Sequence, residues 1–177
     1  PLQMVDSLAN DPSVVRIDIG ETAREMLDSV RVLSYIDEIH AGTNGLSGSY
    51  KGKGVIVGII DTGFDYTHPN FKDAAGNSRI QCAWDQTDSS SPNNSYGYGR
   101  VYDSPAAVAA AMHDKSFDTH GTHVAGIAVG SAEGKFKGVA PEADIMLVST
   151  NKTEQSIVDG VDFLINYAQA QNKPLAI

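Results

Sequence analysis

The feature that most constrains this chain is an unbroken apolar run at residues 55–60, in which every residue but Gly58 is β-branched. A strand with one solvent-exposed face alternates apolar and polar residues, whereas a run without polar residues is typical of a parallel strand buried on both faces. Parallel strands are joined by helices that cover the sheet. The run therefore predicts a central strand in an α/β domain.

Helix and strand patterns alternate along most of the chain. The other expected strands are residues 79–84, 144–149 and 174–177, the last as the start of a strand. Apolar residues at helical spacing, or an Ala-rich composition, predict helices at residues 22–40, 105–112, 120–130 and 155–171. Such an order predicts a parallel sheet covered by helices.

Two segments stand apart from this alternation. Residues 1–34 form an N-terminal unit with an expected helix at 2–8 and an expected strand at 14–19. Residues 72–118 are polar and rich in turn residues, so we interpret them as a long insertion across the surface. Residues 35–177, with this insertion, are expected to form one compact domain.

Composition excludes several classes of partner. The sequence has 13 Lys and Arg against 22 Asp and Glu, a net charge of -9, which would repel nucleic acid and anionic membrane surfaces. It has no apolar run near the roughly 20 residues that span a bilayer, and no signal peptide pattern. Cys82 is the single cysteine, so no intrachain disulfide can form, and it is expected to be a buried apolar residue.

Two residues point to acid–base chemistry. Asp61 directly follows the apolar run, where a carboxylate is costly to bury without a hydrogen-bond donor or a cation. His120 begins a predicted helix whose small residues let other backbone approach closely. A carboxylate that accepts the Nδ1 proton of a histidine leaves Nε2 free to take a proton from a nucleophile. The spacing does not by itself bring Asp61 and His120 together.

Three strings in series resemble the subtilisin family of serine endopeptidases. The first two, VGIIDTGFDYTHP at 57–69 and HGTHVAG at 120–126, resemble its aspartate and histidine signatures, and GVAPEADI at 138–145 resembles the segment that follows them. The resemblance implies an α/β, parallel-sheet, subtilisin-like domain that is truncated before its C-terminal half. It also implies that Asp61 is the triad aspartate and His120 the general base, with protein or peptide substrates.

The resemblance also implies what these 177 residues lack. Family members take the nucleophilic serine from a later Gly-Thr-Ser-Met-Ala string, which does not occur here, while Ser149 and Ser156 belong to other segments. We therefore expect the 177 residues to be inactive on their own. The missing continuation of the sheet predicts self-association through the exposed strand edge.

No cofactor is expected for the chemistry. One calcium site of the resembling family uses an aspartate where this chain has Asn70, and an asparagine-rich loop where it has residues 131–135. Structural calcium is thus unsupported at that site, and the acidic surface leaves calcium open elsewhere. Residues 1–34 resemble the end of an inhibitory propeptide, or else form a plain N-terminal extension. A propeptide would make the protein a zymogen, and the family implies a secreted or cell-envelope location.

Several histidine and aspartate residues of these strings allow other interpretations. His120 and His123 share a helical face and could form a zinc pair, but the H-E-x-x-H pattern is absent. His68 and His123 are interpreted as packed structural residues, and Asp65 as a turn-stabilising one. At the level of function, the alternative is a non-catalytic module that keeps the subtilisin scaffold for binding or regulation.

Overall fold

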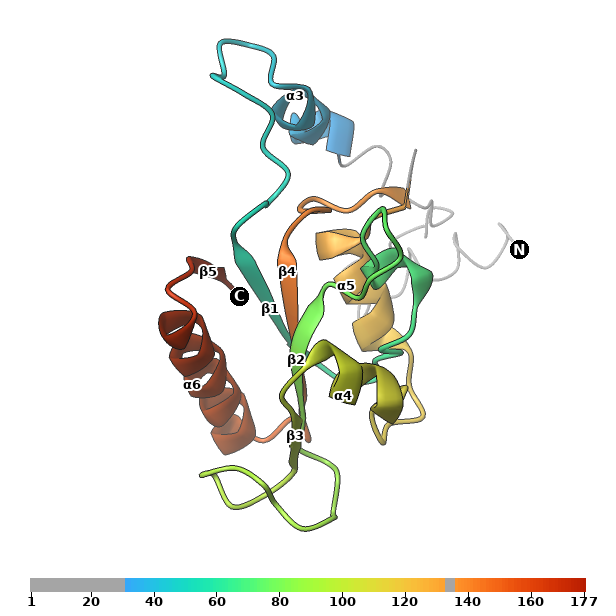
Figure 1. Ribbon diagram of the computed structural model, residues 1–177, viewed down its shortest axis with the longest axis vertical. Coiled ribbons are helices and arrows are strands. Elements are labelled where there is room, and N and C mark those ends of the chain that lie inside the picture. The colour runs from blue at the N-terminus through green and yellow to red at the C-terminus, as the bar shows by residue number, and fades with distance from the viewer. Residues whose placement is uncertain (1–30, 133–135) are drawn as a thin grey trace, which may run out of the picture.

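A five-stranded sheet forms the centre of the protein, for which a computed structural model describes residues 31–132 and 136–177 (Figure 1). Its strands are β1 (Ile56–Asp61), β2 (Ile80–Asp85), β3 (Arg100–Tyr102), β4 (Asp144–Ser149) and β5 (Leu175–Ala176). They lie in the order β3-β2-β4-β1-β5. All neighbours pair in parallel except β2 and β3, which are antiparallel. The predicted α/β class and parallel sheet are confirmed, with β3 as an unpredicted antiparallel edge.

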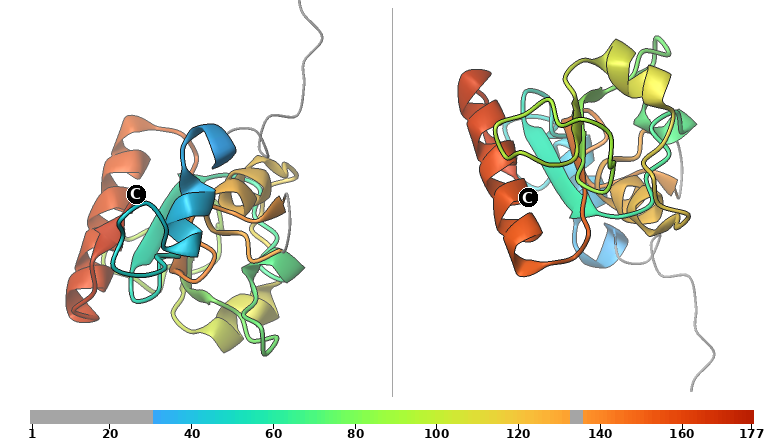
Figure 2. Two further views of the ribbon diagram at one scale, coloured as in Figure 1. Left: turned by 90° about the horizontal axis from the view of Figure 1, so that it is seen from above. Right: turned by 90° about the horizontal axis from the view of Figure 1, so that it is seen from below.

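Helices cover both faces of this sheet. The helical elements of the described residues are α3 (Ile36–Ala41), the 3-10 turn η1 (Pro69–Phe71), α4 (Pro105–Ala111), α5 (His120–Val129) and α6 (Glu154–Ala170). α6 lies on one face, α4 and α5 lie on the other, and α3 stands beyond one end of the sheet (Figures 1 and 2). Within the described ranges, no helix is both long and apolar enough to cross a bilayer.

Alternating side chains of β4 fill the two layers of core. Ile145 and Leu147 pack in the cluster that includes residues of α4 and α5, whereas Met146 and Val148 pack in the cluster that includes residues of α6. All four are fully buried, as expected of a strand with helices on both sides. The glycine of β1 has a packing reason as well. A Cβ at Gly58 would lie 2.6 Å from a methyl group of Leu164, so a larger residue there would require the Leu164 side chain to move.

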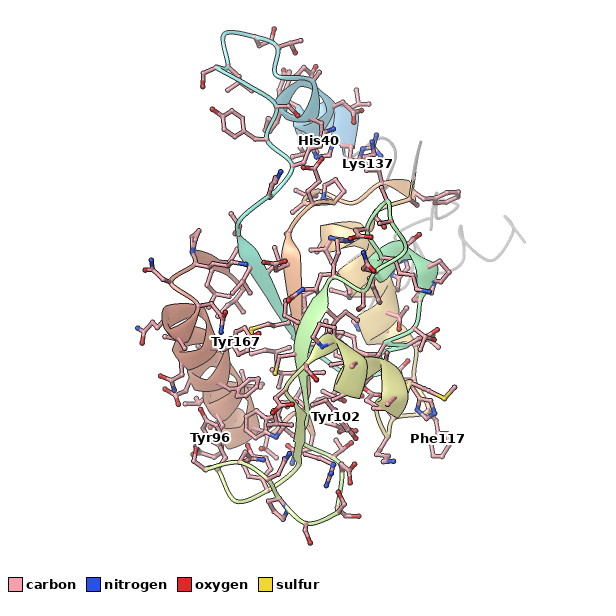
Figure 3. The ribbon with its side chains drawn as sticks, viewed as in Figure 1. His40, Tyr96, Tyr102, Phe117, Lys137 and Tyr167 are labelled. Carbon is pink, nitrogen blue, oxygen red and sulfur yellow. The ribbon has the colours of Figure 1, made fainter. Side chains whose placement is uncertain are left out.

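The segment 72–118 is not confined to the surface. β2 lies between β3 and β4, and Trp84 on it is completely buried. The following loop folds back over α6, so that Tyr96 stacks on Trp84 with ring centroids 4.6 Å apart. Figure 3 shows Tyr96 beside α6 and Tyr102 at the end of β3. The expectation of a surface layer is wrong because the aromatic side chains of this segment need a dry environment, which the sheet and α6 supply. That the segment is an insertion relative to other proteins stays a prediction.

The described part of the predicted helix 22–40 is broken by a turn before α3, where Tyr35 has a φ of 58°. α3 is fixed to the domain through His40, whose Nε2 lies 2.7 Å from the carbonyl oxygen of Val139 (Figure 3). The helix and strand expected before residue 20 lie outside the described residues.

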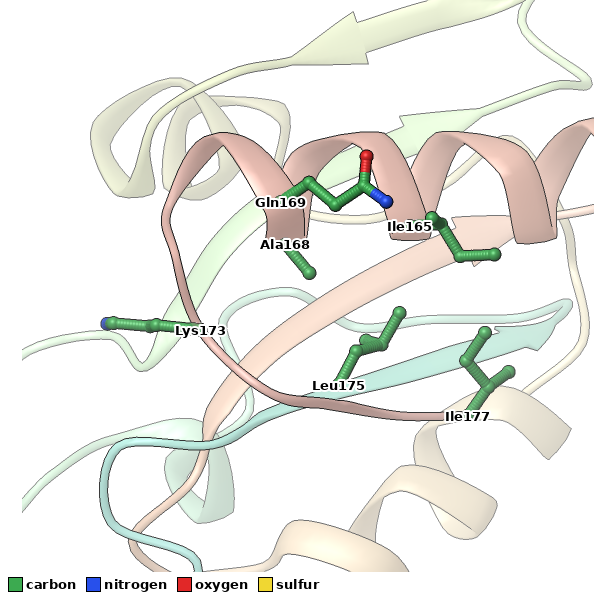
Figure 4. Close-up of a pocket in the computed structure, with 6 residues that line it drawn as sticks. All are labelled: Ile165, Ala168, Gln169, Lys173, Leu175 and Ile177. Atoms are coloured by element: carbon green, nitrogen blue, oxygen red, sulfur yellow. The ribbon is translucent and has the colours of Figure 1, made fainter.

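The outer edge of β5 borders a groove beside α6 (Figure 4). Three apolar residues of this groove, Ile165, Leu175 and Ile177, keep part of their surface exposed. β5 pairs with β1 on its inner side through Leu175 and Ala176.

Candidate active site

The turn after β1 is pressed against the segment that leads into α5. Gly63 in this turn has a φ of 84°, which L side chains rarely adopt. A Cβ there would lie 2.4 Å from the backbone of Asp118. Glycine is therefore required at this position for two independent reasons. Because Gly63 has no side chain, the end of β1 can contact the segment before α5.

Backbone hydrogen bonds join this turn to the first turn of α5. The amide of Gly121 donates to Thr62 O at 2.7 Å, and the amide of Thr122 donates to Gly63 O at 3.0 Å. These donors are among the first amides of a helix, which have no partner within the helix itself. The close approach depends on Gly121, because a Cβ at this residue would lie 2.7 Å from the ring of Phe64.

This docking brings Asp61 and His120 together. Nδ1 of His120 lies 2.8 Å from Oδ1 and 3.0 Å from Oδ2 of Asp61. An ionised carboxylate can only accept, so the geometry assigns the proton to Nδ1 and leaves a lone pair on Nε2 of the neutral ring. The side chain of Asp61 is 16% exposed and that of His120 is 61% exposed. The carboxylate is thus held inside, while the imidazole reaches the surface.

Asp61 is also held from the backbone side. Its Oδ1 accepts a 2.7 Å hydrogen bond from the amide of Thr62, and its own carbonyl oxygen accepts one from Thr150 N at 2.8 Å. The second bond extends the pairing of β1 with β4 by one residue. These contacts fix the direction in which the Asp61 carboxylate faces the imidazole.

Comparisons with known proteins show the family of the chain. The model of a family described as the subtilase family matches residues 52–174. The chain belongs to the subtilase family. The structure of the CspB protease of Clostridium perfringens superimposes with a TM-score of 0.61 and 31% identity, over 80% of this subtilase chain and 32% of that chain.

Curated relatives of this subtilase are proteases. The C5a peptidase of Streptococcus pyogenes is 27% identical over 93% of this chain and 14% of that protein. The minor extracellular protease Vpr of Bacillus subtilis is 32% identical over 64% of this chain and 12% of its own length. The major intracellular serine protease of Bacillus subtilis is 30% identical over 65% of this chain and 31% of that protein. The chain therefore spans less than a third of the length of each of these relatives.

Asp118 stabilises the start of α5 in this subtilase. Its Oδ1 accepts hydrogen bonds from the amides of Thr119 at 2.7 Å and His120 at 3.1 Å. These two bonds to the charged form lower the pKa of the Asp118 carboxyl from its ordinary value, with the amide of Thr119 as the largest cause. Asp118 was not singled out from the sequence, because it lies one position before the N-cap Thr119 and accepts from the amides that directly follow it rather than from the N2 or N3 amide of a standard cap.

Asp114 is a buried carboxylate that joins two parts of the site through three hydrogen bonds. Its Oδ2 accepts from the amides of Gly63 at 2.8 Å and Phe64 at 3.1 Å, and from Ser149 Oγ at 2.5 Å. The residue is 1% exposed. It thereby links the turn after β1 to the end of β4. Sequence reasoning missed it, because backbone donors some fifty positions away leave no mark in the local pattern of residue types.

An open pocket borders the Asp61 and His120 pair. Its lining residues are Ile60, Asp61, Asp118, His120, Thr150, Lys152 and Ile157. Within the ranges 31–132 and 136–177, no hydrogen bond joins His120 Nε2 to a serine. Ser149 and Ser156 are both buried, and Ser156 Oγ lies 2.8 Å from Thr153 O. Neither serine lines the pocket.

The remaining candidate residues have varied roles. Asp65 accepts from the amide of Thr67 at 2.8 Å and from its hydroxyl at 2.7 Å, as expected of a turn-stabilising side chain. His68 Nδ1 accepts from the amide of Asn70 at 3.2 Å and so caps η1. His123 is exposed, so its interpretation as a packed residue is wrong. In the described part of the chain, no group of three or more His, Cys, Asp or Glu side chains could hold a metal ion.

Proposed function

We propose that the protein to which this chain belongs is a serine endopeptidase, with Asp61 and His120 as two members of an Asp-His-Ser triad. The observation that carries the proposal is the 2.8 Å contact between His120 Nδ1 and Asp61 Oδ1. The contact orients the imidazole so that Nε2 is the ring nitrogen left to meet a nucleophile. Membership in the subtilase family and the protease relatives support the same assignment.

In the proposed reaction, a serine hydroxyl attacks the carbonyl carbon of a peptide bond, and His120 Nε2 takes the hydroxyl proton. His120 then gives this proton to the leaving amine as the C–N bond breaks, which leaves an acyl-enzyme. Water, deprotonated by the same nitrogen, hydrolyses the acyl group and restores the serine. Asp61 stays ionised throughout, holds the ring in one tautomer and stabilises the positive charge that the ring carries in between.

We propose further that residues 1–177 do not catalyse this reaction by themselves. Ser149 and Ser156 are buried and bonded elsewhere, so neither can meet Nε2. A triad without its nucleophile retains at best about 10³–10⁴-fold catalysis over water, and that remainder depends on substrate binding and an oxyanion hole. The isolated 177 residues are expected to hydrolyse neither casein nor peptide esters, and to resist labelling by fluorophosphonates.

The proposal is tested by fluorophosphonate labelling and peptide hydrolysis with the full-length protein. The unsubstituted protein should be labelled at one serine outside residues 1–177. His120→Ala should abolish labelling and hydrolysis, and Asp61→Asn should lower kcat by roughly 10⁴-fold, because the amide favours the wrong tautomer. His123→Ala, one turn further along α5 and exposed, is the matched control and should change neither.

Two outcomes would contradict the proposal. Labelling of Ser149 or Ser156 would place the nucleophile within this chain. A folded full-length protein that is neither labelled nor active would instead favour a binding or regulatory module built on the subtilase scaffold.

We also propose that the protein is made as a secreted or cell-envelope zymogen, from which an N-terminal segment is removed by a cut within residues 20–40. The name of the Vpr relative, an extracellular protease, supports the location, although another relative is named as intracellular. N-terminal sequencing of the protein from culture medium and from cells tests both parts. A mature N-terminus between residues 20 and 40 in the medium is expected.

A further inference from the structure

Arg79, the residue directly before β2, places a guanidinium group inside the protein. It is 7% exposed, and its donors reach three backbone carbonyl oxygens. Nη1 donates to Ala143 O at 2.9 Å, and Nη2 donates to Asn70 O at 3.0 Å and to Val129 O. Among residues 31–132 and 136–177, no carboxylate lies within ion-pair distance of this group. Its partners are backbone dipoles rather than a counter-charge.

The three carbonyl groups belong to three different elements. Val129 is the last residue of α5, Asn70 lies in η1, and Ala143 directly precedes β4. The last carbonyl groups of a helix have no partner within the helix and carry the negative end of its dipole. A cation at Val129 O therefore stabilises the C-terminal end of the helix that has His120 at its other end.

This junction lies where the family resemblance implies a calcium ion, beside Asn70 and the loop after α5. The residues present do not fit one, because Asn70 supplies a neutral amide where the family's site uses a carboxylate, and the backbone oxygen beside it is already occupied. The carbonyl oxygen of Asn70 accepts from Arg79 Nη2 and also from both the amide and the hydroxyl of Ser131, each at 2.9 Å. A carbonyl oxygen has two lone pairs, so these three donors leave none for a metal ion.

The positive charge of Arg79 also argues against a calcium ion at this junction. A guanidinium stays protonated in proteins even where burial lowers its pKa from the ordinary value, as burial does for Arg79. A divalent cation placed beside it would be repelled in a region with little water to screen the two charges. Nε of Arg79, which is buried and has no partner within the described residues, is a donor and cannot ligate a cation.

We infer that the guanidinium of Arg79 supplies the positive charge at this junction, and that it holds α5 in place without a bound metal ion. The planar fork of arginine suits this task, because it directs several N–H groups to separate acceptors from one fixed position. The inference concerns how the domain is held together, and it stands whether or not the protein cleaves peptides.

Amide hydrogen exchange of the full-length protein, read by mass spectrometry on peptides from α5 and α6, tests the inference. Exchange in α5 of the unsubstituted protein should be the same in EDTA and in excess calcium. Arg79→Met removes three hydrogen bonds to buried carbonyls and should speed exchange in α5 by roughly tenfold or more. Arg79→Lys keeps the charge without the fork and should fall in between. Arg100→Met, at a half-exposed arginine on β3, is the matched control and should leave α5 unchanged.

Two results would overturn the inference. The first is slower exchange in α5 of the unsubstituted protein when calcium replaces EDTA, which would reveal a metal ion at work. The second is an Arg79→Met protein that exchanges in α5 like Arg100→Met. If Arg79→Met does not fold, the calcium comparison and the Arg79→Lys variant decide the question without it.

Discussion

At the scale of single residues, two glycines make room for the contacts on which this site depends. Gly121 leaves the space in which the ring of Phe64 lies, and Gly63 leaves the space in which the backbone of Asp118 lies. Asp61 and His120 meet because these two positions carry no side chain. Small residues beside a histidine are therefore part of how the acid–base pair is assembled.

Gly121→Ala is expected to lower the free energy of unfolding by about 1–3 kcal/mol, because the new methyl group would lie 2.7 Å from the buried ring of Phe64. Gly126→Ala in the same helix is the matched control, since a Cβ there meets nothing within 4 Å outside its own helix. Alanine in a helix interior is favoured over glycine by about 1 kcal/mol, so this control should be neutral or stabilising. Urea unfolding of both variants provides the measurement, and equal effects would argue against the packing explanation.

The sequence pattern identified one aspartate of the site and missed another. Asp61 could be singled out because a carboxylate directly after six apolar residues is unusual. Asp114 could not, because two of the three donors to its Oδ2 are the backbone amides of Gly63 and Phe64, and any residue type supplies such amides. The contact between Asp61 and His120 also needed the family resemblance, since no local pattern specifies which helix docks on which turn.

At the scale of elements, the loop between β2 and β3 is fixed to α6 by two tyrosines. Tyr96 donates to Asp162 Oδ2 at 2.6 Å, and Tyr98 donates to Asp159 Oδ2 at 2.7 Å. Burial, followed by the hydrogen bond to Asp162, raises the pKa of Tyr96 to about 12. Burial and the bond to Asp159 raise the pKa of Tyr98 above its ordinary value as well. Both shifts favour the neutral phenol in the folded protein.

These shifts predict an alkaline loss of stability. Tyrosine in an unfolded chain titrates near pH 10, whereas folded Tyr96 holds its proton to about 12. The stability that the Tyr96 hydroxyl contributes is thus fully present below about pH 10 and is lost as the pH rises through about 12. Tyr96→Phe should flatten this part of the stability curve, as measured by urea unfolding at roughly pH 9 and pH 11. Tyr35→Phe, at an exposed tyrosine before α3, serves as control, and an equal flattening there would contradict the assignment.

The elements differ in how well their sequences predicted them. β1, β4 and α6 were predicted almost to their ends, because long apolar or amphipathic runs identify their own type. β3 was missed because its three residues have no pattern of their own, and the strand exists through its pairing with β2. The burial of β2 was missed because neighbouring polar turns suggested a surface segment.

At the scale of the whole molecule, the edge beyond β5 predicts self-association of the isolated 177 residues. Ile165 and Ile177 remain 39% and 61% exposed beside a strand edge that no strand of residues 31–132 and 136–177 covers, and open edges pair with other chains. Sedimentation should show a dimer that Ile165→Lys weakens. Val158→Lys, on α6 but outside the groove, should have no effect.

A monomer at low and high protein concentration would contradict this prediction. Self-association that appears only after residues 1–34 are removed would instead indicate that this N-terminal segment covers the edge.

The order of the strands has a consequence for how the chain reaches this structure. β1 lies between β4 and β5, so that Ile56 pairs with Asp144 on one side and with Leu175 on the other. Both neighbours follow β1 by a long stretch of chain, and pairings so distant in sequence form slowly because a large loop must close first. During synthesis β1, which ends at Asp61, cannot pair on both sides until most of the 177 residues have been made. In that interval the apolar residues of β1 stay exposed, and the segment is open to proteolysis and aggregation.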